Sequence, residues 1–147
     1  MSLDFYCEFG EKCLNEKLIE ATIRDYFNCG DNLERGKNFN GWIYHGFTER
    51  DKLHLYYTPE EGTELDYFES EILGCNFYSK QSLLLAPNRD EGGIDLRREM
   101  LKFFIYIQSK VDSDVLVWAD CYGEICLVTD EGVTWADNEL ISSIRLW

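Results

Sequence analysis

Two hydrophobic periods divide this chain into strands and helices. Residues 3–9 alternate, with Leu3, Phe5, Cys7 and Phe9 on one face, which predicts a half-buried strand. Two longer segments instead repeat every three to four residues, at about 12–28 and 95–111, and this spacing predicts amphipathic helices. We expect Gly30 to end the first helix in a left-handed conformation and Asp95 to cap the second.

The remaining apolar stretches are short and bounded by turn residues, as strands of an antiparallel sheet are. The predicted strands are 42–47, 53–58, 76–85, 114–120, 124–129 and 133–135. Residues 32–40 are predicted to be a loop, 60–71 a loop or one short helix, and 138–147 a short helix or an edge strand. The sequence therefore predicts one globular α+β domain over 1–147, mainly an antiparallel sheet with two main helices packed on one face.

The chain is strongly acidic, with 28 Asp and Glu against 14 Lys and Arg and a formal charge of −14. Nucleic-acid binding depends on cations that displace counterions from phosphates, so this charge argues against a nucleic-acid partner. It also argues against docking on an anionic membrane surface. A basic protein, a cation, or simple solubility are the roles that such a charge favours.

Cysteine use and the start of the chain point to a reducing compartment. No basic segment followed by an apolar run opens the sequence, so we expect no secretory signal. The six cysteines contain no Cys-x-x-Cys pair. We therefore expect free thiols in structural roles and a cytoplasmic protein.

No catalytic or metal-binding signature is present. Asp120 and Glu124 flank a predicted turn, where paired acids usually face water. Cys75 with His45 or His54 would make a nucleophile and base only if the fold joined them, which leaves a hydrolase as a third possibility. We predict that the protein is not an enzyme and uses no cofactor or metal.

A small-ligand or calcium-binding domain is the main alternative to a protein-binding role. Calcium binds several oxygens from one short loop. Asp130 with Glu131, or the segment 60–64, could supply some of these ligands, but neither has the ladder of an EF-hand.

Half of the acids lie in two stretches without any Lys or Arg, residues 53–79 and 111–144. Aromatic residues are interleaved with them, as in a site where anchors bury contact area and charge speeds the encounter with a basic protein. The competing interpretation is that the aromatics are core residues and the acids a solvated rim. The candidate partner-binding residues are Glu60, Glu61, Glu64, Asp66, Tyr67, Glu69, Glu71, Asp120, Tyr122, Glu124, Asp130, Glu131 and Trp135.

With its acidic runs, and its strand-turn-strand unit 114–129 after a long apolar helix, the chain resembles small bacterial immunity proteins encoded beside polymorphic or contact-dependent growth-inhibition toxins. The resemblance implies an acidic, cytoplasmic, non-enzymatic single domain. Such a protein covers the active site or substrate surface of a cognate toxin, often a basic nuclease. The resemblance supplies no site residues, since no short motif carries it.

Overall fold

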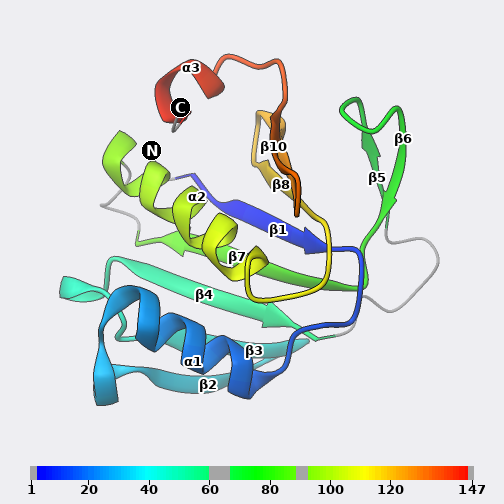
Figure 1. Ribbon diagram of the computed structural model, residues 1–147. Helices are drawn as coiled ribbons and strands as arrows, with labels where there is room; N and C mark the ends of the chain where they lie inside the picture. Colours follow the sequence, from blue (N-terminus) through cyan, green and yellow to red (C-terminus); the bar gives the residue numbers. More distant parts are fainter. Residues whose placement is uncertain (1–2, 60–66, 89–92, 146–147) are drawn as a thin grey trace.

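The computed structural model describes residues 3–59, 67–88 and 93–145. An eight-stranded antiparallel sheet has the order β10-β9-β8-β1-β7-β4-β3-β2 (Figure 1). Its strands are β1 (Phe5–Phe9), β2 (Glu34–Asn38), β3 (Gly41–His45), β4 (Leu53–Thr58), β7 (Gln81–Pro87), β8 (Val115–Ala119), β9 (Gly123–Thr129) and β10 (Gly132–Trp135). The predicted α+β class, with its antiparallel sheet, is confirmed.

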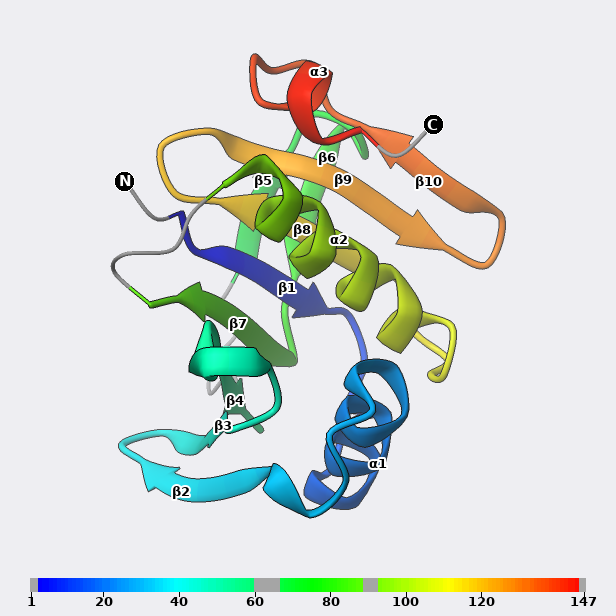
Figure 2. The ribbon, with the colours of Figure 1, turned by 90° about the vertical axis from the view of Figure 1, so that its left-hand side faces the viewer.

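The helices α1 (Glu16–Phe27) and α2 (Ile94–Gln108) pack on one face of this sheet, and the short α3 (Ile141–Ile144) lies beside α2 (Figure 2). The predicted alternation of the first strand is confirmed, since Phe5, Cys7 and Phe9 are fully buried under the helices. They join α2 residues such as Phe103 and Phe104 in the main core. None of the helices in these ranges is long and apolar enough to cross a membrane.

The ends of both helices differ from the prediction. The Oδ1 atom of Asn15 accepts a hydrogen bond of 2.8 Å from the backbone N–H of Leu18 and caps the start of α1. At its other end Asn28, not Gly30, is the cap residue, with φ 53° and ψ 44°. The second helix begins at Ile94 after Gly93, so Asp95 lies in its first turn and does not cap it.

Several predicted strands and loops were wrong in their bounds. Most of the predicted loop 32–40 is strand β2, an edge strand of mostly exposed polar residues that has no apolar alternation to reveal it. The predicted strand 76–85 is two strands, β6 (Cys75–Tyr78) and β7, because the chain turns at Ser79 and Lys80. Residues Tyr67–Ser70 form strand β5, whereas 60–71 was predicted to be a loop or a short helix. Of the two alternatives for 138–147, the structure has the short helix, α3.

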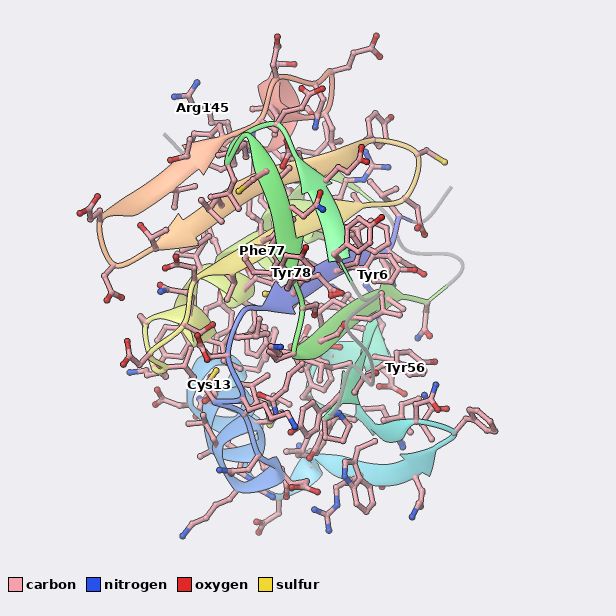
Figure 3. The ribbon with its side chains drawn as sticks, turned by 90° about the vertical axis from the view of Figure 1, so that its right-hand side faces the viewer. Tyr6, Cys13, Tyr56, Phe77, Tyr78 and Arg145 are labelled. Atoms are coloured by element: carbon pink, nitrogen blue, oxygen red, sulfur yellow. The ribbon has the colours of Figure 1, made fainter. Side chains whose placement is uncertain are left out.

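The hairpin of β5 and β6 crosses the other face of the sheet and covers only part of it (Figure 3). Phe77 of β6 packs with Leu116 of β8 and Leu127 of β9 in a second, small hydrophobic cluster, to which Phe68 and Ile72 are added. In the part of the chain that the structure describes, the two faces of the sheet are therefore unequal, since helices bury one and the β5–β6 hairpin covers one end of the other.

The buried Gln81 fixes the connection between β1 and α1. Its Oε1 atom accepts hydrogen bonds from the backbone N–H groups of Cys13 at 2.8 Å and Leu14 at 2.7 Å. Its Nε2 atom lies 3.0 Å from the carbonyl oxygen of Leu14 and 3.2 Å from the hydroxyl of Tyr57, which itself donates to Leu14. One side chain thus satisfies a loop that would otherwise bury unpaired backbone groups.

We predict that Gln81→Ala lowers the free energy of unfolding by about 2–4 kcal/mol, because each buried group left without a partner costs about 1–3 kcal/mol. Urea denaturation measures the loss. Asn76→Ala, an exposed amide on β6, is the control and should leave stability nearly unchanged. Equal stability of the two variants would contradict the role given to Gln81.

Candidate functional site

The two acid-rich stretches meet where the hairpin turn approaches the β8–β9 turn. A depression of about 300 Å³ lies between them, which we call the acidic depression. It is lined by Glu69, Glu71, Tyr122, Gly123, Glu124, Ala136, Asp137 and Asn138. Two of the predicted acids on the hairpin thus lie next to the predicted Tyr122 and to Asp137, which comes from the second stretch.

Glu124, although it lines the depression, is a structural acid. Its carboxylate accepts hydrogen bonds from the Ser70 hydroxyl at 2.8 Å and from the backbone N–H groups of Glu71 at 2.8 Å and Ile72 at 3.2 Å. Bonds to an ionised acceptor are stronger than those between neutral groups. Glu124 therefore ties the turn of the hairpin to β9, which fixes the positions of Glu69 and Glu71.

Exposed tyrosines stand beside these acids. Tyr122 is 38% exposed in the β8–β9 turn, and Tyr67 and Tyr78 are 44% and 51% exposed on the hairpin. The rings of Tyr67 and Tyr78 lie 5.9 Å apart as a cross-strand pair (Figure 3 labels Tyr78). The sequence analysis included Tyr67 and Tyr122 but missed Tyr78, because the pairing that brings it beside Tyr67 depends on the hairpin.

Other predicted residues lie elsewhere. Asp130 and Glu131 form the β9–β10 turn at the far end of β9, whose seven residues span about 23 Å at about 3.3 Å per residue. Trp135 packs against the main core on the helix side, with the Arg145 guanidinium 5.8 Å from its ring. Glu60, Glu61, Glu64 and Asp66 lie outside the described residues. The thirteen predicted residues do not form one continuous surface among those that are described.

Asp120 follows the end of β8 and lies next to Asp4, so these two acids form a second acidic cluster, separate from the acidic depression. The backbone N–H of Asp120 donates to the carbonyl oxygen of Asp4 at 3.4 Å. Burial, and then the neighbouring charge of Asp120, raises the pKa of Asp4 above its usual range. Burial also raises the pKa of Tyr6 to about 12, with further contributions from Asp120 and Asp4. These two carboxylates are therefore crowded by like charge.

The two histidines form a cluster around Asp51 that the sequence analysis did not predict. The Oδ2 atom of Asp51 lies 3.3 Å from Nε2 of His54 and 3.6 Å from Nδ1 of His45, and Glu34 lies 3.3 Å from the other nitrogen of His45. Burial opposes ionisation of Asp51, but the hydrogen bond from Gly46 N–H and the two histidines outweigh it and lower its pKa. The carboxylate thus holds the β3–β4 connection together.

The structure separates Cys75 from both histidines. Cys75 pairs with Ser70, whose hydroxyl bonds to Glu124 on β9. The strand β9 lies four positions from β4 in the sheet order, about 19 Å at about 4.8 Å per strand. The hydrolase arrangement is therefore not assembled. Within the described ranges, no group of three or more His, Cys, Asp or Glu side chains is arranged to hold a metal ion.

Comparison with known proteins gave no match to a family model, to a curated protein or to a solved structure. The interpretation of these surfaces therefore depends on their own geometry and charge.

We predict that Glu124→Ala releases the turn of the hairpin from the sheet. The backbone N–H groups of Glu71 and Ile72 lose their acceptor and should exchange with solvent faster, by at least about tenfold if the lost bonds are worth about 1.4 kcal/mol or more. Hydrogen–deuterium exchange measures this at the two residues. Glu69→Ala, an exposed acid on β5, is the control; similar exchange in both variants would contradict the role of Glu124.

We predict that Asp51 stabilises the fold in a pH-dependent way. Because its pKa is lowered on folding, its contribution is present above its unfolded pKa of 3.8 and is lost as the pH falls through the lower folded value. The half-exposed site limits the effect to about 1 kcal/mol or less. Urea denaturation from about pH 7 down to about pH 3 should show Asp51→Asn less stable than the parent only at the higher pH. A constant difference across the range would contradict the prediction.

Proposed function

We propose that this chain is a non-enzymatic binding protein that neutralises a basic cognate toxin in the cytoplasm of the producing cell, as an immunity protein does. The observation that supports it most directly is the acidic depression, which Glu69, Glu71 and Asp137 line together with the exposed Tyr122. A toxin that acts on a polyanion carries a cationic cleft, and these carboxylates would take the place of the substrate there.

The negative charge raises the association rate of such a surface with a basic partner, and the exposed aromatic residues contribute binding energy. A formal charge of −14 attracts a basic partner over a distance and raises the rate of productive encounter. Tyr122, Tyr67 and Tyr78 then offer large, amphipathic contact area of the kind that dominates binding energy in protein interfaces. Inhibition requires no chemistry, because occupation of the cleft excludes the substrate.

The hydrogen bonds between Glu124 and the hairpin turn favour binding by a preorganised surface. Glu124 fixes the turn that carries Glu71, so little conformational freedom is lost when a partner docks. The separation of Cys75 from His45 and His54 also favours a binding role over a hydrolytic one. A gene directly downstream of a large secreted-toxin gene, or co-purification with such a toxin from the native host, would identify the partner.

We predict that the triple variant Glu69→Lys, Glu71→Lys and Asp137→Lys binds the co-purified toxin with an association rate at least about tenfold lower at low salt, because electrostatic steering changes association rates by about 10- to 1,000-fold. The difference should shrink as salt is added. Stopped-flow mixing with the toxin measures the rates.

The matched control reverses three exposed acids near the other end of β9, namely Asp130→Lys and Glu131→Lys in the β9–β10 turn and Asp112→Lys in the α2–β8 connection, which precedes the pairing of Val115 with Val128. It changes the net charge by the same amount but leaves the acidic depression intact. Equal slowing in both variants would assign the effect to overall charge. Unchanged rates in the first variant would exclude the depression from the interface.

A further inference from the structure

The face of the sheet opposite the helices carries one apolar row that crosses five strands. Cross-strand pairing places Trp118 beside Tyr6, Tyr6 beside Leu84, Leu84 beside Tyr56, and Tyr56 beside Ile43. We call these five residues the aromatic row. All five are half-buried, and none belongs to either hydrophobic cluster. Tyr6 and Tyr56 are labelled on this face, which also carries the hairpin, in Figure 3.

The positions on either side of the aromatic row, two residues along each strand on the same face, are mostly polar or small. On one side of the row lie Glu8, Ser82 and Thr58, followed under the hairpin by Leu116, and of these Glu8, Ser82 and Leu116 are buried. On the other side lie His54, Ala86 and Asp4, which are half-buried. A sheet face turned to water normally alternates with polar residues. A continuous line of large apolar side chains on such a face is typical of a surface that a partner covers.

At the β8 end of the aromatic row, the rings of Tyr6 and Trp118 are stacked on each other. The rings of Tyr6 and Trp118 are 3.8 Å apart and parallel within 5°, and the ring of Phe68 from the hairpin lies 5.4 Å from Trp118. Side chains already fixed by stacking lose little freedom on binding, which makes them good anchors. Leu84 and Tyr56 extend this apolar contact away from the hairpin.

The charges beside the row determine which partner fits. Asp4 and Asp120 lie next to Tyr6 at one end, and Glu34 and Asp51 flank the histidines at the other. In the described parts of the chain, no Lys or Arg forms an ion pair with Asp4 or Asp120. A second copy would bring another charge of −14 against these acids and would be repelled.

We propose that the aromatic row and its flanking acids bind an extended, arginine-bearing segment of the basic partner. The inference rests on the proposed function for the partner's basic character and adds a second contact surface to the acidic depression. An arginine stem lies along Tyr6 and Leu84, while its guanidinium pairs with the carboxylates of Asp4 and Asp120. Apolar side chains of the segment cover Leu84 and Tyr56.

Two synthetic peptides of equal positive charge test this surface, one alternating Arg with Leu and the other alternating Arg with Ser. Titration into the ¹⁵N-labelled protein, followed by two-dimensional NMR, should shift the amides of β1, β4, β7 and β8 with the Arg–Leu peptide. The Arg–Ser peptide should bind more weakly, because it cannot cover the apolar row.

Two variants locate the contact. Tyr56→Ala and Asp120→Asn should each weaken binding of the Arg–Leu peptide by about tenfold, equal to about 1.4 kcal/mol. Phe39→Ala is the matched control, since Phe39 is a 96% exposed aromatic in the turn between β2 and β3, and it should leave the affinity unchanged. Unaltered affinity in both test variants, whose folding is checked by their NMR spectra, would overturn the proposal.

The other outcomes separate this inference from the proposed function. Shifts confined to the acidic depression, or no shifts up to about 1 mM peptide, would overturn the sheet-face site and leave the function to be decided by the toxin association rates. A dimer detected by sedimentation and dissociated by Tyr56→Ala would identify a second copy as the occupant and would also overturn the proposal.

Discussion

The structure depends on the alternation of side chains along β1, the strand held between β7 and β8. Phe5, Cys7 and Phe9 point to the helices and are fully buried, so Tyr6 and Glu8 must point to the opposite face. The helices cover the first face only. Among the described residues, the β5–β6 hairpin is what covers the second face, and Tyr6, Leu84 and Trp118 are left half-buried there. The candidate binding surfaces follow from this inequality.

Charge in the sequence does not translate directly into charge on one surface. Glu124 belongs to an acid-rich stretch, yet its carboxylate is used by Ser70, Glu71 and Ile72 to hold the hairpin. Asp130 and Glu131 are at the opposite end of β9 from the acidic depression. What the fold does bring together is a smaller set, Glu69, Glu71 and Asp137 with Tyr122. The positions of the acids therefore determine the negative surface more than their number does.

The parts of the fold with a regular hydrophobic period were predictable. The alternation of residues 3–9 and the helical spacing near 16–27 were read correctly, because burial of one face imposes those periods. The strand β2 was not, since an edge strand can have exposed charges throughout. The aromatic row could not be found, because Tyr6, Leu84 and Trp118 become neighbours only through a strand order that local patterns do not encode.

Side-chain footprinting by hydroxyl radicals, with and without the co-purified toxin, would show whether the partner docks on the sheet face that carries the hairpin. In the complex, Tyr56, Tyr78 and Tyr122 should lose reactivity, while Phe39 keeps its own. Protection of residues on the helix side, such as Tyr106, with those three tyrosines unchanged, would contradict the account.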